Sequence, residues 1–263
     1  MPPPAAAAAA GGGGLGGARP ALRGVFVNVR GLAAAAARAR LFRALARERV
    51  DVAVLAETHC RDDAAANTWL RQGGWTGDAR WAHGSAASRG VGVLLSSHLQ
   101  ATQISVDFSD DDGRVLRVGW RDAAARPWAA VAVYAPNDDA GQRRLFGPSG
   151  PLRAALASGS AAARVLLSAA AAGAARFTHP SSCGTARRLD RVYISAALLP
   201  MVRQCRHLPL GSWPGDHCAV LFALGEPRAP AAAAGAARFT HPSSCGTARR
   251  LDRVYVSAAL LPM

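Results

Sequence analysis

Residues 50–59 read VDVAVLAETH, an apolar run that closes on Glu57, Thr58 and His59. A short valine-rich run that ends in polar residues is typical of a buried β-strand. The polar end of such a strand reaches the edge of its sheet, where functional side chains of α/β proteins gather. We therefore expect Glu57 to lie at the rim of a sheet.

Two other segments repeat this layout, residues 22–32 (LRGVFVNVRGL) and residues 127–137 (PWAAVAVYAPN). Residues 33–49 predict a helix with Leu41, Phe42 and Leu45 on one side, and residues 142–158 predict a partly helical segment. Because several strands follow one another with few helices between them, the order favours a two-sheet α/β sandwich over a doubly wound sheet. Further strands are expected at residues 90–97, 114–121, 163–168, 187–195 and 217–224.

The chain is strongly basic, with a net charge of +14 over 263 residues. All 31 of its Lys and Arg residues are arginines, whose planar guanidinium binds phosphate through two parallel donors. Such a balance indicates a polyanionic partner, nucleic acid first. The expectation that DNA comes before RNA does not rest on the charge. The alternative is that GC-rich coding DNA alone explains a composition rich in Ala, Arg, Gly and Pro.

The five cysteines show neither a CxxC pair nor the spacing of a zinc site, so a reduced, intracellular protein is expected. No apolar run is long enough to span a bilayer, and the N-terminus lacks the layout of a secretory signal. These features predict no membrane partner and leave nucleus and cytoplasm equally open. They say nothing about the oligomeric state.

Residues 169–201 recur as residues 231–263, with Ile194 against Val256 as the one difference. Two copies are too few for a solenoid, so a recent duplication or a gene-assembly error explains them better. We therefore expect a disordered, low-complexity N-terminus over residues 1–21, one α/β domain over residues 22–226, and a linker with a duplicated segment over residues 227–263.

Only the first copy is followed by an Asp-His pair, Asp216-His217, whereas the second copy offers Thr240 and Asp252 without one. The first copy is therefore the one expected to work. We expect the second copy to be loosely held or to displace the strand of the first, since a sheet cannot easily tell two nearly identical strands apart.

Polar residues at strand ends make up the candidate site. Carboxylates, an imidazole, a phenol and amides together suit metal-assisted cleavage of a phosphodiester, because a hard cation such as Mg²⁺ prefers carboxylate oxygens and a histidine can move the proton of water. Each residue alone has a plainer explanation as a strand cap, a surface ion pair or a turn residue. The candidates are Asn28, Glu57, Tyr134, Asn137, Asp190, Asp216 and His217.

The ordered series NVRGL, LAETH, SRGVGVLLS, VYAPND, RRLDRVYIS and PGDHCAV resembles the endonuclease/exonuclease/phosphatase superfamily with the DNase I-like fold. Within it, the series is most similar to the apurinic-endonuclease-like domain of LINE-type retrotransposons. The resemblance runs from about residue 22 to residue 224. It implies a two-sheet α/β sandwich whose rim cuts phosphodiesters or phosphomonoesters with Mg²⁺, or with Mn²⁺ in its place.

The resemblance also implies a role for each matching residue. Glu57 matches the metal-binding glutamate, and Asp216 matches an aspartate near the metal. The implied catalytic residues are the histidine, its aspartate partner, the phosphate-contacting tyrosine and the asparagine of the first strand, namely His217, Asp190, Tyr134 and Asn28. The implied substrate-binding residues are Asn137 and, as a weaker match, Thr178.

Two departures from the family pattern affect the expected activity. Arg30 stands where relatives usually carry Asp or Asn. The GDFN motif that follows the strand ARVLL in relatives is absent, since this chain continues SAAAAGAARFTH. The sandwich is therefore expected to be incomplete around this segment and the nuclease to be impaired. The alternatives are an inactive nucleic-acid-binding remnant, a phosphatase of the same superfamily, and a decayed element without a selected role.

Overall fold

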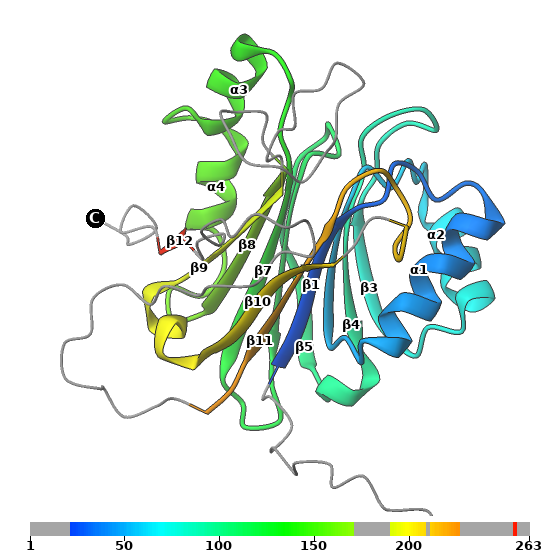
Figure 1. Cartoon of the computed structure of the whole chain (residues 1–263). Helices are drawn as coiled ribbons and strands as arrows, with labels where there is room; N and C mark the ends of the chain where they lie inside the picture. Colours follow the sequence, from blue (N-terminus) through cyan, green and yellow to red (C-terminus); the bar gives the residue numbers. More distant parts are fainter. Residues whose placement is uncertain (1–21, 171–189, 209–210, 227–254, 257–263) are drawn as a thin grey trace, which may run out of the picture.

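The computed structural model describes residues 22–170, 190–208, 211–226 and 255–256. Two six-stranded sheets pack face to face, and helices cover their outer faces (Figure 1). The expected two-sheet α/β sandwich is confirmed. None of the helices within these residues has the length and apolar character needed to cross a bilayer.

The first sheet carries the strands that open and close the domain. In spatial order it consists of β10 (Val202–Leu208), β11 (Ala219–Leu224), β1 (Leu22–Asn28), β2 (Val52–Ala56), β4 (Val91–Ser96) and β3 (Gly77–Ala82). Two helices, α1 (Ala35–Arg47) and α2 (Asp63–Gly73), lie on its outer face (Figure 1).

The second sheet holds the middle of the chain. Its order is β12 (Tyr255–Val256), β9 (Asp190–Ile194), β8 (Arg164–Ala170), β7 (Pro127–Tyr134), β6 (Val115–Arg121) and β5 (Thr102–Ser109). The helices α3 (Asp139–Phe146) and α4 (Pro151–Ala157) lie on its outer face. Short 3₁₀ turns, Ser97–Leu99 and Ala196–Met201, follow β4 and β9.

The apolar runs of the central strands are continuous because both of their faces are buried. On β1, Phe26 points into the core between the sheets, while Val25 and Val27 pack with Leu41 and Leu45 of α1. Successive side chains of a strand point to opposite faces, so one short run serves two layers. The expected apolar side of α1 is confirmed, since Leu41, Phe42 and Leu45 are buried.

Pairing around β1 brings distant parts of the chain to one rim. β1 runs parallel to β2, with Asn28 beside Ala56, and antiparallel to β11, with Phe26 beside Val220. The end of β1, the end of β2 and the start of β11 therefore meet at the same edge. In the second sheet, Tyr134 at the end of β7 lies beside Ala170 of β8, which lies beside Asp190 of β9.

One helix and four strands were not predicted from the sequence: α2, β3, β5, β10 and β12. β3, β5 and β10 lie at sheet edges, and β5 is largely exposed along its length, so few of its residues need to be apolar. α2 does carry a start signal, since the Asp62 carboxylate accepts a bond from the Ala65 N–H at 2.8 Å, and Gly74 in the left-handed region ends the helix.

The two described residues of the second copy pair with the first copy. Tyr255 and Val256 of β12 lie parallel to Tyr193 and Ile194 of β9, so each residue sits beside its own counterpart. The remainder of the second copy and residues 1–21 lie outside the described residues. The expected division of the chain into three parts therefore stays a prediction.

Close approach at the β1–β11 pair gives a test of this packing. Gly24 lies directly opposite Phe222, and a Cβ on Gly24 would overlap the buried phenyl ring. We expect Gly24→Ala to lower the free energy of unfolding by about 1–3 kcal/mol through overpacking. In a double-mutant cycle followed by chemical denaturation, Phe222→Leu should relieve part of that loss. Strictly additive effects would contradict the predicted contact.

Candidate active site

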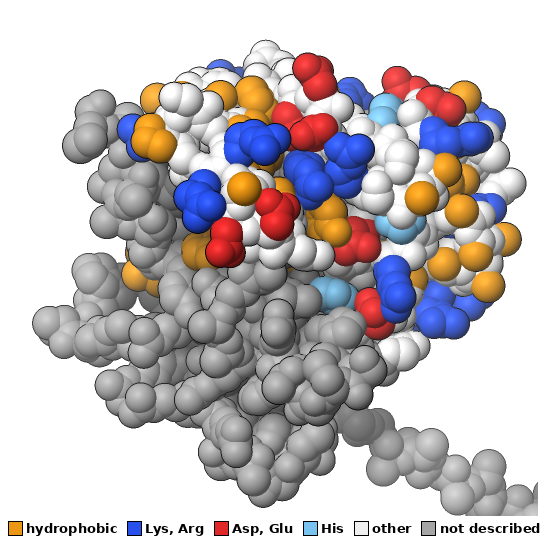
Figure 2. All heavy atoms as spheres, turned by 90° about the horizontal axis from the view of Figure 1, so that it is seen from above, with side chains coloured by type: hydrophobic (Ala, Val, Ile, Leu, Met, Phe, Trp, Pro, Cys, Tyr) orange, Lys and Arg blue, Asp and Glu red, His pale blue; other side chains and the backbone are white. Residues whose placement is uncertain are grey.

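The candidate site is built from strand ends of both sheets. Asn28 is the last residue of β1, Glu57 follows β2, and Tyr134 ends β7. Asp216 and His217 lie just before β11. The face seen in Figure 2 has acidic, basic and histidine side chains interspersed over this end of the molecule. The structure thus brings together residues that are up to about two hundred positions apart in the sequence.

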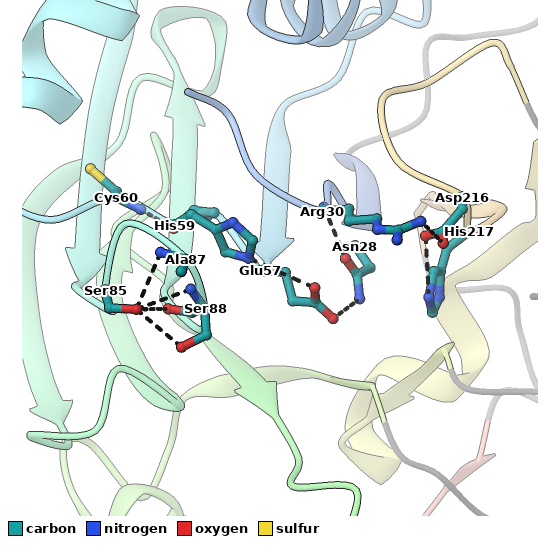
Figure 3. Close-up of polar contacts among 11 residues, drawn as sticks. Asn28, Arg30, Glu57, His59, Cys60, Ser85, Ala87, Ser88, Asp216 and His217 are labelled. Atoms are coloured by element: carbon teal, nitrogen blue, oxygen red, sulfur yellow. Dashed lines mark hydrogen bonds and ion pairs between the residues drawn. The ribbon is translucent and has the colours of Figure 1, made fainter. Parts of the chain in front are cut away.

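Asn28 holds Glu57 in place. The Asn28 side chain is 2% exposed, and its Nδ2 donates to Glu57 Oε1 at 2.8 Å (Figure 3). The other end of the same amide, Oδ1, accepts a bond from the Arg30 backbone N–H at 3.0 Å. A buried amide must have partners for both ends, and here the two partners are the site glutamate and the turn after β1.

The backbone around Glu57 is tied down on both sides. Its carbonyl accepts a bond from the Gly31 N–H at 2.7 Å. The next two N–H groups, of Thr58 and His59, bond to the carbonyls of Gly90 and Arg89 at 3.0 Å each. Glu57 itself has φ 54°, in the left-handed region of backbone conformation. This conformation is unfavourable for any residue other than glycine. These bonds hold that conformation and aim the carboxylate at the rim.

Tyr134 lies against the same carboxylate. Burial, followed by the charge of Glu57 and the hydrogen bond to it, raises the pKa of the Tyr134 phenol to about 12. The Arg114 guanidinium lies over the ring, 5.3 Å from its centroid, and opposes part of this rise. The phenol therefore stays protonated and can donate a hydrogen bond at any physiological pH.

His59 and Arg114 were missed as site residues by the sequence reasoning. His59 Nε2 lies 3.8 Å from Glu57 Oε2, and the Arg114 NH1 donates to the Tyr134 carbonyl at 3.3 Å. The signal for His59 was present, since it closes the LAETH segment. Arg114 opens the strand segment RVLRVGWR, where nothing in the sequence distinguishes it from other arginines.

Asp216 and His217 lie on the other side of Arg30. Asp216 Oδ2 accepts from Arg30 NH1 at 2.6 Å, and Asp216 Oδ1 lies 3.7 Å from His217 Nε2 (Figure 3). The His217 side chain is 9% exposed, whereas that of Asp216 is 34% exposed. The imidazole is thus held inside the rim, with one edge at the carboxylate.

Of the remaining predicted residues, the structure describes Asn137 in full, Asp190 by its backbone alone, and Thr178 not at all. The backbone of Asp190 opens β9 beside Ala170, at the level of Tyr134, and its side chain lies outside the described part. Asn137 is exposed, three positions after β7. Thr178 lies outside the described residues. The proposed pairing of Asp190 with His217 therefore stays a prediction.

The register also locates the missing GDFN motif. By the family resemblance, the motif is expected directly after the segment ARVLL, at residues 168–171. Ser168 pairs with Ala132, and Ala170 pairs with Tyr134, so the motif would stand at the same rim as the phenol. This chain carries Ser-Ala-Ala-Ala there.

The carboxylates predicted to bind a hard divalent cation, Glu57 and Asp216, differ in their partners. Mg²⁺ is commonly bound by one or two carboxylates together with water and substrate phosphate. Glu57 offers such a carboxylate, whereas Asp216 has the Arg30 guanidinium as its partner. Within the described residues, no group of three or more His, Cys, Asp or Glu side chains converges.

Comparison with known proteins supports the fold. The Endonuclease/Exonuclease/phosphatase family model matches residues 25–155. The AP endonuclease LMAP from Leishmania major is similar to this chain with a TM-score of 0.61 and 16% identity, over 78% of this chain and 88% of that one. The search of curated proteins returned no match.

Two further solved structures are similar. The 3′-5′ exonuclease NExo from Neisseria meningitidis gives a TM-score of 0.56 at 16% identity, over 78% of this chain and 100% of that one. The endonuclease domain of TRAS1, a telomere-specific non-LTR retrotransposon, gives 0.50 at 13% identity, over 77% and 98%. At such identities the likeness shows the fold.

The contact between Tyr134 and Glu57 is testable by titration. At a pH about half a unit above 10, an ordinary tyrosine is largely ionised, whereas Tyr134 should stay protonated. Glu57→Gln removes the negative charge that disfavours tyrosinate, so the Tyr134 pKa should fall toward its ordinary value while burial keeps it above that value. Ultraviolet absorbance of tyrosinate measures this, with Tyr134→Phe identifying its share. An unchanged titration in Glu57→Gln would refute the contact.

Proposed function

We propose, because the chain belongs to the endonuclease/exonuclease/phosphatase family, that it hydrolyses phosphodiester bonds of nucleic acid with the help of Mg²⁺. Within this activity, we propose that it acts as the endonuclease domain of a LINE-type retrotransposon. The observation that carries the proposal is the Glu57 carboxylate, held by Asn28 beside the Tyr134 phenol at the rim of the sandwich, with His217 on the same rim.

Each of these side chains has a distinct part in the proposal. Glu57 would hold the cation, Mg²⁺ or Mn²⁺ in its place, which when bound neutralises charge on the phosphate. Asn28 positions Glu57. The protonated Tyr134 phenol would donate to a phosphate oxygen and stabilise the charge that builds up there.

His217 is proposed as the residue that handles the proton. A buried imidazole beside a carboxylate can orient or deprotonate water, or donate to a phosphate oxygen. Asp216 Oδ1 lies 3.7 Å from its Nε2, and Asp190 is proposed as the partner that orients the ring. Asn137, exposed beyond β7, and Thr178 are proposed to contact the substrate backbone.

The proposed rate is low because of the residues at the end of β8. A carboxylate that positions the nucleophile typically contributes about 10²–10⁴-fold to a rate. Ser168, Ala169 and Ala170 offer neither the aspartate nor the asparagine of the GDFN motif at this rim. We therefore propose an impaired nuclease that hydrolyses phosphodiesters more slowly than a family member that retains the GDFN motif.

Nucleic acid is the proposed substrate, DNA before RNA. We also propose an intracellular location, in the nucleus or the cytoplasm, where such a substrate is found. The net charge of +14 favours a polyanion. Two of the similar structures are titled as an AP endonuclease and a retrotransposon endonuclease domain. A third similar structure, NExo from Neisseria, was solved with a product DNA hairpin.

A second candidate function is binding of nucleic acid without cleavage. The observation that favours it is the Arg30–Asp216 ion pair, which places a permanent cation beside the carboxylates of the rim. Together with the absent motif, this arrangement would let the rim hold a phosphate without hydrolysing its ester bond.

A nicking assay separates the two functions. Supercoiled plasmid is incubated with the full chain in Mg²⁺ or in EDTA, next to Glu57→Gln, His217→Ala and the control Arg153→Ala, an exposed residue of α4. We expect slow nicking that requires Mg²⁺, drops about 10²–10⁴-fold in His217→Ala, and is unchanged in the control. Glu57→Gln should abolish the response to Mg²⁺.

Other outcomes of this assay would contradict the proposed nuclease activity. Nicking that persists in EDTA, or that survives both site variants, would refute the assigned site. A chain that is folded by circular dichroism, binds DNA and does not nick it would establish the second candidate function.

A further inference from the structure

Arg30 is held more firmly than a typical surface arginine. Its backbone has φ 47°, and its N–H donates to Asn28 Oδ1 at 3.0 Å. The following N–H, of Gly31, donates to the Glu57 carbonyl at 2.7 Å. The turn that carries Arg30 is thus fixed by the same amide that fixes Glu57, and the guanidinium starts from a defined place at the rim.

The guanidinium is engaged on one side and exposed on the other. NH1 donates to Asp216 Oδ2 at 2.6 Å, yet 66% of the Arg30 side chain is exposed. Within the described residues, this is the one side-chain hydrogen bond of Arg30. An arginine carries five N–H donors in a rigid fork, so donors remain for a further acceptor.

The surroundings of Arg30 point to an anion as that acceptor. Figure 3 shows Arg30 between the Asn28–Glu57 pair and the Asp216–His217 pair. Two carboxylates at one rim would repel a phosphate that arrives without a cation. A fixed guanidinium between them offsets this repulsion and presents the two-pronged geometry that matches phosphate oxygens.

We propose that Arg30 is a phosphate-binding residue, held at the rim by the turn after β1, that lets this chain hold the nucleic-acid backbone in the absence of a divalent cation. The inference rests on the nucleic-acid substrate of the proposed function and does not require cleavage. It gives a role to the one residue of the first strand motif that departs from the family pattern.

A plainer explanation is a surface ion pair with no role beyond stability, since exposed pairs contribute about 0–1 kcal/mol. The two explanations differ in what Asp216→Asn does. Both Arg30→Ala and Asp216→Asn break the ion pair, but only Arg30→Ala removes the donor of the phosphate. Asp216→Asn instead keeps this donor and removes a negative charge that repels the phosphate.

The test is the binding of a fluorescent DNA duplex by the full chain in EDTA, followed by anisotropy over a series of salt concentrations. We expect Arg30→Ala to weaken binding several-fold and to reduce the slope of log K against log salt by about 0.9, the loss of one phosphate contact. Arg30→Lys should keep the slope and lose part of the affinity. Asp216→Asn should bind as well as the wild-type chain or more tightly.

Arg43→Ala, an exposed arginine of α1, is the matched control and should bind like the wild-type chain. The inference is overturned if Arg30→Ala binds with the wild-type slope, if Arg43→Ala loses as much as Arg30→Ala, or if Asp216→Asn weakens binding as much as Arg30→Ala. Because binding is measured without metal, the result does not depend on whether the chain nicks DNA.

Discussion

The bond from the Asn28 amide to Glu57 is the interaction on which the rest of the site depends. Asn28 is the last residue of the central strand β1, and its side chain is buried. One end of the amide holds the glutamate at 2.8 Å, and the other end holds the turn with Arg30 at 3.0 Å. A buried amide without hydrogen-bond partners costs free energy. The need to satisfy the Asn28 amide therefore fixes both Glu57 and the turn that carries Arg30.

The two sheets add their own strand ends to this centre. β7 brings Tyr134 to Glu57, and the backbone of β9 opens at the same level with Asp190. β11, paired with β1, places His217 and Asp216 on the other side of Arg30. The arrangement provides a phenol that stays protonated, one carboxylate suited to a cation, and a permanent cation beside the other carboxylate.

Much of the fold and part of the site follow from the sequence alone. The central strands are buried on both faces, so their apolar runs stood out, and the polar residues that close them marked the rim. The edge strand β5 is largely exposed and the edge strand β3 is only partly buried, so neither carried such a signal. The Arg30–Asp216 pair joins residues 186 positions apart, and only the β1–β11 pairing brings them together. The structure places several of the predicted residues at one rim, but the chemical role of every one of them rests on resemblance and remains a prediction.

The central claim is that this rim is a phosphodiesterase site whose rate is limited by the absence of the GDFN motif at the end of β8. The most direct test grafts Gly-Asp-Phe-Asn onto residues 168–171 and compares Mg²⁺-dependent nicking with the natural chain. We expect the graft to raise the rate by about 10²–10⁴-fold, and a graft with Asn in place of its Asp to fall short of this. A folded graft that nicks no faster than the natural chain would contradict the claim.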